Sequence, residues 1–484
     1  MSASSSLFPS NLMSATKLFS RISVKRFEGP SYRSHGSVEK CFVVLLTARG
    51  GVVASLKSAT DHNPWTDLGH ISSETQQTYA DLRDSGFPSD VFPEEQLLLD
   101  APMVGDVDVS GADVFLAQAN FLPGGILLAL TTFHAATDGA GMLNITKVWA
   151  QNLRELQQLD SSNGPAPFRF SPRDLERKIP DQIWQRCQHD EPSKRSFNQD
   201  DRWLRGLVAL NPGDDAKAIE DAVGTDSNTH KQGSPSRKHS RTMINRIMFL
   251  SSVDLAALQK TCAAEPVPAG TPPVSASDAI HALLWRTQIR ARVAAAEARS
   301  FQLSATESVF ESPVDIRISF GPNFPSAYAG NCWLLNTARM PVAKLIPPST
   351  SLGHIAQVLR EAGARVETRA IQDAYSLLQS TDDLSRVQGR FVDRLNSADF
   401  LVSNMIFFQM SEINFGSRYF GNNGMPQSVR VLHGQYAPYV RLGHVLPRNS
   451  SHGGVEISMN LFNDEMDFIN KDQEFIRYLV GIDS

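Results

Sequence analysis

A short turn, His134-Ala135-Ala136-Thr137-Asp138-Gly139, holds the residues whose types and spacing could do chemistry. Its imidazole is followed four positions later by a carboxylate and then by a glycine. An imidazole titrates near neutral pH and, when it is held rigidly beside a cavity, can take a proton from a substrate hydroxyl. His134 is therefore a candidate general base. A histidine that is merely satisfied inside the core would show the same pattern, which is short enough to recur by chance.

The segments on either side of this turn predict how it is positioned. Residues 126–134 are mostly apolar and suit a buried strand, and residues 114–121 alternate well enough to be its partner. Pro123-Gly124-Gly125 between them predicts a hairpin turn. Residues 139–158 then place apolar side chains at helical spacing. We expect a strand, a tight turn and a helix, with His134 at one end of a sheet.

The composition is that of a globular protein with a large core. Of 484 residues, 41% are hydrophobic and 20% are charged. The net charge of -5 argues against nucleic acid as a partner, because such proteins usually carry a basic stripe. No apolar run approaches the roughly 20 residues of a membrane helix. Four scattered cysteines predict neither a disulfide framework nor a metal site and fit a reducing compartment.

Changes in composition along the chain predict its domains. Residues 1–30 are rich in serine and basic side chains, and we interpret them as a disordered or wrongly assigned extension; a mitochondrial presequence is the alternative. Residues 31–210 would form an N-terminal domain that carries His134. Residues 211–241 contain few large apolar side chains and predict an exposed linker. Residues 242–484 would form a C-terminal domain.

The second half restarts with regular elements. The patterns predict a strand at 246–250, a helix from 274 to 292 capped by Ser275 or Ser277, a strand that begins at 314–317, a strand at 453–461 and a closing helix over 462–480. His281 lies in the helix that ends at 292, and we interpret it as a structural residue.

Four blocks, taken in this order, resemble the BAHD acyltransferase superfamily, and within it the fungal trichothecene 3-O-acetyltransferase-like branch. They are Gln118-Ala119-Asn120-Phe121 with Pro123-Gly124-Gly125, the His134 to Gly139 turn, Val314-Asp315-Ile316-Arg317 with Gly330-Asn331, and Asn414-Phe415-Gly416 with the strand at 454–461. One block alone would be weak support, whereas four in the right order are specific.

The resemblance implies an α/β fold of two chloramphenicol-acetyltransferase-like domains with a channel between them. His134 would lie in that channel as the catalytic base. Acyl-CoA, most simply acetyl-CoA, and a small-molecule alcohol would enter from opposite faces. No permanently bound cofactor and no metal are implied. We further expect a cytoplasmic monomer without nucleic-acid or membrane partners. Sesquiterpenoid, polyketide and alkaloid alcohols all remain open as acceptors.

The resemblance also assigns roles to other residues. Asp138 would form a structural ion pair with Arg317, and Gly139 would allow the tight turn. Asn414-Phe415-Gly416 replaces the usual Asp-Phe-Gly, a structural motif whose aspartate pairs with an arginine. Ser403 and Arg418 are candidate contacts for CoA, and a solvated surface arginine is the alternative for Arg418. Asn414, Ser403 or a backbone N–H could stabilise the oxyanion, and Arg430 is either a CoA contact or a solvated surface residue.

Two other interpretations stay open. A relative of condensation domains would take its acyl group from a carrier protein, but those domains carry two adjacent histidines where Phe133 precedes His134 here. A degenerate, non-catalytic binding protein is the second alternative. It is favoured by Asn414 and by residues 1–70, which match the family poorly.

Overall fold

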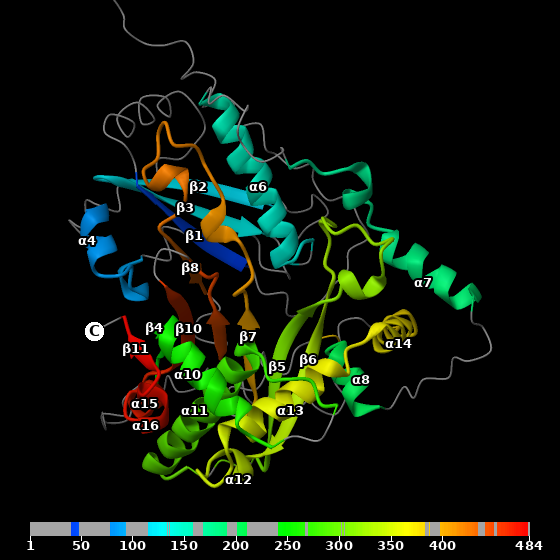
Figure 1. Cartoon of the computed structure of the whole chain (residues 1–484), viewed down its shortest axis with the longest axis vertical. Helices are drawn as coiled ribbons and strands as arrows, with labels where there is room; N and C mark the ends of the chain where they lie inside the picture. The colour runs from blue at the N-terminus through cyan, green and yellow to red at the C-terminus, as the bar shows by residue number, and fades with distance from the viewer. Residues whose placement is uncertain are drawn as a thin grey trace, which may run out of the picture.

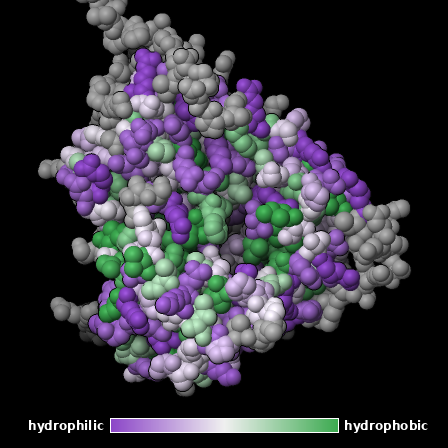
Figure 2. Space-filling model, viewed as in Figure 1, coloured by the Kyte–Doolittle hydropathy of each residue, from purple (hydrophilic) through white to green (hydrophobic). Residues whose placement is uncertain are grey.

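The computed structural model describes residues 40–47 (as a strand), 78–92, 115–132, 134, 136–157, 168–190, 201–210, 241–266, 270–301, 303, 305–382, 387, 397–433, 441–449 and 453–482. They form two sheets with helices packed against them (Figure 1). Figure 2 shows the same face hollowed near its middle, with hydrophobic residues gathered around the hollow. The extension 1–30 and linker residues 211–240 lie outside the described residues.

The smaller sheet delivers the His134 turn. Its order is β2-β3-β1-β8, all antiparallel, with β1 at Lys40–Thr47, β2 at Phe115–Leu122, β3 at Gly125–Thr132 and β8 at Ser428–Leu432. The predicted hairpin is thus confirmed. Every residue of β3 is buried, as expected for a continuous apolar strand between two partners. Helix α6, Gly139–Leu156, packs Met142, Trp149 and Leu153 against this sheet.

The larger sheet has seven strands in the order β11-β4-β10-β9-β7-β5-β6. Their bounds are Met243–Ser251 (β4), Glu307–Asp315 (β5), Trp333–Pro341 (β6), Phe400–Asn404 (β7), Leu442–Val445 (β9), Gly454–Phe462 (β10) and Leu479–Gly481 (β11). Strand β7 runs parallel to β5 and β9, and the other pairs are antiparallel.

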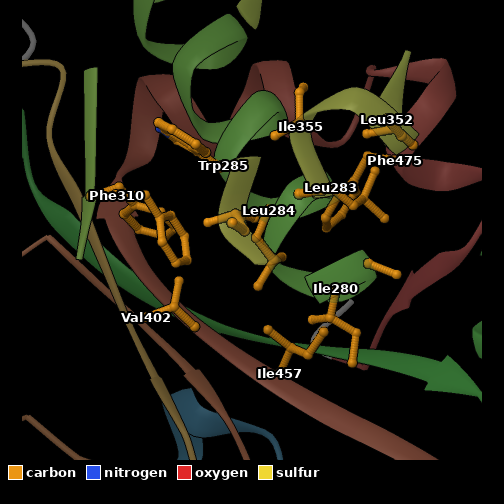
Figure 3. Close-up of a cluster of buried hydrophobic side chains, with 14 of the residues drawn as sticks. Ile280, Leu283, Leu284, Trp285, Phe310, Leu352, Ile355, Val402, Ile457 and Phe475 are labelled. Carbon is orange, nitrogen blue, oxygen red and sulfur yellow. The ribbon is translucent and has the colours of Figure 1, made fainter. Parts of the chain in front are cut away.

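Helices cover this sheet and form the main core. They are α10 (Ser252–Ala263), α11 (Ala276–Ala298), α12 (Val342–Leu345), α13 (Leu352–Ala364), α15 (Asn463–Ile469) and α16 (Gln473–Ile476). Figure 3 shows Ile280, Leu284 and Trp285 of α11 directed toward Phe310, Val402 and Ile457 of the strands. This core holds the larger sheet in place, including the start of β6, which contacts the His134 turn.

The remaining elements pack at the edges. They are α4 (Tyr79–Asp84), α7 (Ile179–Asp190), α8 (Arg202–Leu207), α14 (Thr368–Gln379) and the short 3-10 turns η1 (Ser89–Val91), η3 (Pro172–Leu175), η6 (Ile318–Phe320), η8 (Met410–Glu412) and η9 (Asn422–Gly424). Helices α7, α8 and α14 share one apolar cluster, which includes Leu334 of β6. Among the described helices, none is both long and apolar enough to cross a membrane.

The two halves of the chain, before and after the expected linker, each contribute elements to both sheets and the helices packed on them. Strand β8 comes from the second half yet pairs with β1, and α8 comes from the first half yet packs on β6. Arg430 of β8 joins the two sheets, since its Nη1 and Nη2 donate to Glu456 of β10 at 2.9 Å each. Arg430 also donates to the carbonyls of Gly86 and Phe87. It is buried, so both the solvated and the CoA-binding interpretation of Arg430 were wrong. The domain boundaries themselves stay a prediction.

Three element predictions were wrong in detail. Residues 314–317 end a strand instead of beginning one, because polar Ser308 and Glu311 hid the buried start of β5. Helix α11 runs past 292 to Ala298, since residues 293–298 are mostly alanine, a strong helix former. The expected closing helix is divided into α15 and α16, with Asp472 capping the second, and then becomes strand β11.

Candidate active site

The His134 turn is held by a segment from the other half of the chain. His134 follows β3 by two residues, and its carbonyl accepts a hydrogen bond from Asn331 Nδ2 at 2.7 Å. Its ring meets the Trp333 ring edge-on, with the ring centroids 5.9 Å apart. The residue is only partly buried. The imidazole therefore has a fixed backbone and access to one side, as a general base requires.

The carboxylate of Asp138 accepts hydrogen bonds from groups other than the His134 ring. It caps α6 through Oδ1, which accepts from the Gly141 amide at 3.0 Å and from Arg317 Nη2 at 2.8 Å. Oδ2 accepts from the Cys332 amide at 2.9 Å. The ion pair with Arg317 that the resemblance implied is thus present. Both oxygens are engaged, which favours positioning of the turn over a catalytic dyad with His134.

Arg317 ties the turn to the loop that leads into β6. Besides Asp138, it donates to the carbonyls of Tyr328 and Gly330 at 2.9 Å each and to Asp315 at 3.1 Å. The side chains of Arg317 and Asp138 are only 5% and 6% exposed. Burial alone would raise the pKa of Asp138, but the Arg317 charge and two backbone amides outweigh it and hold that pKa below its usual value. The pair is therefore ionised at neutral pH.

This lowered pKa gives a pH dependence of stability. The pKa of an aspartate in the unfolded chain is about 3.9. The contribution of Asp138 to the free energy of unfolding is therefore present above that pH, and it is lost as the pH falls toward the lower pKa of the folded state. We expect urea unfolding to show a stability deficit of Asp138→Asn relative to wild type at neutral pH that narrows in acid. The exposed Asp84→Asn is the control. Parallel curves for wild type and Asp138→Asn would contradict the assignment.

Two residues that position the turn were missed from the sequence. A Cβ at Gly141 would lie 2.7 Å from the Ala329 carbonyl oxygen, so the close approach to that loop requires glycine here. The sequence analysis emphasised Gly139, although Gly141 follows two residues later in the first turn of α6. Arg177 Nη1 donates to the Ala136 carbonyl at 2.8 Å, and no local pattern marks that arginine.

The Asn414-Phe415-Gly416 block binds the opposite end of α6. The Asn414 carbonyl accepts from Arg154, and the Phe415 carbonyl accepts from Gln157 Nε2 at 2.6 Å. The fully buried Phe415 ring meets Trp149 edge-on, with centroids 6.0 Å apart. Asn414 Oδ1 accepts from the Gly416 amide at 2.7 Å. Because Arg154 uses the backbone carbonyl, replacing the family's aspartate with asparagine does not leave this arginine without an acceptor.

The length of α6 separates this block from the candidate base. Eighteen helical residues span about 27 Å. Asn414 lies at the far end, so the suggestion that it stabilises the oxyanion beside His134 was wrong. Arg418 is exposed at the same far end and donates to the Gln157 carbonyl at 3.1 Å. Ser403 is buried on β7 in register with His444. The roles of Arg418 and Ser403 as CoA contacts stay predictions.

Gly416 offers a test of how tightly α6 is clamped. Its φ is +105°, and an added Cβ would lie 2.2 Å from Gln157 Nε2. Gly321 has a similar φ of +90° but nothing within 4 Å of such a Cβ. We expect Gly321→Ala to show only the backbone cost of its glycine-specific conformation, about 1–3 kcal/mol, and Gly416→Ala to lose about 1–3 kcal/mol more from the clash. Chemical unfolding measures both, and equal losses would contradict the clamp.

Two cysteines and two histidines of the described ranges are buried in ways that do not suit a catalytic role. Burial raises the pKa of Cys332 and of Cys262 to about 12, so neither is a thiolate nucleophile. Burial lowers the pKa of His281 and of His433 to about 4. His281 lies against Phe310 and Asn404, in keeping with its structural interpretation. Within the described ranges, no group of acidic, histidine and cysteine side chains could hold a metal ion.

A cavity of about 320 Å³ lies between α8 and α14, lined by Trp203, Arg365 and Arg369 among others, and does not include His134. The expected channel beside His134 therefore stays a prediction. The turn is nevertheless built from both halves of the chain: β3 and α6 supply His134 and Asp138, and the loop before β6 supplies their partners. A part-exposed imidazole braced in this way suits proton transfer to or from a bound molecule.

Comparison with known proteins identifies the class. Residues 93–476 match the model of the Transferase family, so the chain belongs to this family of BAHD acyltransferases. The structure is similar to TRI101 of F. graminearum in complex with coenzyme A and deoxynivalenol, with a TM-score of 0.64, 16% identity, and coverage of 92% of this chain and 96% of that one. The similarity confirms the predicted fold class, α/β with two chloramphenicol-acetyltransferase-like domains.

Its curated relatives are fungal proteins. The isocyanide synthase-NRPS hybrid crmA of Aspergillus fumigatus is 29% identical over 376 residues, which cover 76% of this chain and 24% of that protein. The eremophilane O-acetyltransferase ORF8 of Penicillium roqueforti is 23% identical, covering 86% and 81%. The chain spans 24% and 34% of the length of the first two curated relatives that it matches.

Proposed function

We propose that this protein transfers an acyl group from a CoA thioester to the hydroxyl group of a small molecule, with His134 as the general base. The observation that carries the proposal is the bracing of His134. Its carbonyl is bound by Asn331, its ring is partly exposed, and the nearby carboxylate is committed to Arg317. Membership of the Transferase family supports the same reaction class.

In the proposed mechanism, neutral His134 accepts the proton of the acceptor hydroxyl as its oxygen attacks the thioester carbonyl. Alcohols are much weaker acids than imidazolium, so proton transfer accompanies the attack. The new C–O bond forms, the carbonyl electrons move onto oxygen, and the C–S bond breaks when they return. Imidazolium then gives its proton to the departing sulfur. No covalent enzyme intermediate is required.

The relatives support narrower choices of donor and acceptor. ORF8 is named an O-acetyltransferase, and the similar TRI101 structure holds coenzyme A together with deoxynivalenol. We therefore propose acetyl-CoA as the donor, with no permanently bound cofactor, and a ring-bearing alcohol of fungal secondary metabolism as the acceptor.

The test is a direct assay of the purified chain. Acetyl-CoA is supplied with a panel of ring-bearing alcohols that includes deoxynivalenol. The free thiol of released CoA is titrated, and the products are analysed by mass spectrometry for the mass of one added acetyl group. Thiol release that depends on the alcohol and yields an ester supports the proposal. Thiol release without ester, or no release with any acceptor, would count against it.

A second candidate follows from one relative. The crmA protein is named an NRPS hybrid, so a segment similar to this chain occurs within a larger synthase. A carrier protein loaded with an acetyl thioester could then replace acetyl-CoA as the donor. Supplying both donors in parallel separates the candidates, because only the preferred donor should sustain turnover at low micromolar concentration.

A further inference from the structure

Trp333, whose ring contacts that of His134, is much more exposed than two other tryptophans of the chain. Its side chain lies at the start of β6 and is 37% exposed, whereas Trp149 and Trp285 are 2% and 0% exposed. The two residues that precede it are both hydrogen-bonded to the His134 turn. Asn331 binds the His134 carbonyl, and the Cys332 amide binds Asp138, so the residues just before Trp333 are held to the turn. The chain at Trp333 therefore lies beside the turn, and the indole meets the imidazole edge-on.

Other exposed apolar residues lie at the same edge of the larger sheet. Asp315 at the end of β5 is in register with Trp333, and Ile318 follows three residues later with 93% exposure. Strand β7 runs parallel to β5, so Phe407, which follows its end and is 86% exposed, belongs to this edge as well. Large apolar residues so exposed at the ends of neighbouring strands, one of them in contact with the candidate base, suggest a surface that a ligand covers.

We infer that Trp333 is the platform on which the carbon skeleton of the acceptor lies, and that it selects ring-bearing apolar alcohols over flexible ones. This inference rests on the proposed function. A hydroxyl bound to the imidazole nitrogen places its carbon atoms within a few ångströms of the ring, and the indole is 5.9 Å from that ring between centroids. A rigid, apolar ring skeleton makes an extended contact with an indole and loses little conformational freedom on binding.

The acceptor suits this surface better than the donor does. The reacting end of acetyl-CoA is a small acetyl group on a narrow, flexible arm that carries amides, and such an arm offers little area to a flat indole. A fused-ring alcohol offers a complementary apolar face. Trp333 therefore determines acceptor specificity, whereas donor binding is expected to be independent of it.

The test compares two alcohols with ten carbons each, the bicyclic 2-decalol and the straight-chain 1-decanol. We expect Trp333→Ala to lower kcat/KM for 2-decalol about tenfold and to change that for 1-decanol much less. Trp333→Phe should restore most of the activity on 2-decalol. A loss of equal size for both alcohols would show that Trp333 only supports the turn, and it would overturn the inference.

Indole fluorescence gives a readout that does not depend on turnover. Titration with 2-decalol should change the emission of wild type but not of Trp333→Phe, and titration with CoA should change both alike. Trp184→Phe is the matched control, because Trp184 bonds to Ser376 in the α7–α14 contact. A change of emission with 2-decalol that depends on Trp333, without any acyl transfer, would contradict the proposed function but support the binding site at Trp333. Turnover of 2-decalol without any Trp333 dependence, or no response of wild type to 2-decalol, would overturn the site alone.

Discussion

Replacing His134 with alanine should lower the rate of acyl transfer by roughly 10²–10⁴ while the melting temperature stays within experimental error. Without the imidazole, the acceptor hydroxyl must lose its proton to water as it attacks. Stability should hold because the contact that braces the turn is made by the backbone carbonyl of residue 134, which alanine retains. The rate is measured by thiol release with a saturating acceptor.

The matched control is His354→Ala. His354 is exposed on α13, and only its backbone amide takes part in capping that helix. Its loss should leave the rate unchanged. Calorimetric titration with CoA should give similar affinities for wild type and His134→Ala, because the base is needed for the chemical step. A His134→Ala protein that folds normally and keeps the full rate would end the assignment of His134 as the base.

The sequence predicted an element correctly wherever its local hydrophobic pattern and its local turn or cap residues agree. The hairpin of β2 and β3 follows from alternation, an apolar run and a Pro-Gly-Gly turn, and α6 follows from its helical spacing. Of the two serines that the sequence offered as the cap of α11, the structure uses Ser275, which forms a capping box with Asp278. The ion pair of Asp138 and Arg317, 179 residues apart, was implied only by the family resemblance.

The errors arose where distant segments decide the environment. Arg430 carries no local sign that Glu456 and the carbonyls of Gly86 and Phe87 will enclose it. Strand β8 pairs with β1 across almost four hundred residues of chain, which no local pattern reveals. Trp333 follows the Gly330-Asn331 pair by two residues, but only the folded chain brings its ring to the imidazole of His134. The sequence therefore marks His134 as the candidate base, whereas the contacts around it depend on segments that only the fold brings together.

Arg317 should be the residue whose loss unfolds the site. Replacing it with leucine removes the cation from a buried pair and leaves the Asp138 carboxylate nearly inaccessible to water. Removing one member of such a pair typically costs about 3–5 kcal/mol, much more than the pair itself contributes. Arg317→Leu also releases the carbonyls of Tyr328 and Gly330, so the loop before β6 should loosen and acyl transfer should fall with stability.

A double-mutant comparison separates the stranded charge from lost packing. If the unpaired carboxylate dominates, adding Asp138→Asn to Arg317→Leu should recover part of the lost unfolding free energy, because the buried group is then neutral. Arg202→Ala is the control, since Arg202 pairs with Glu307 at the surface with 67% of its side chain exposed and should cost under about 1 kcal/mol. Two losses that simply add would show that Asp138 and Arg317 stabilise the turn independently, and that the charge of Asp138 is not what the arginine is there to balance.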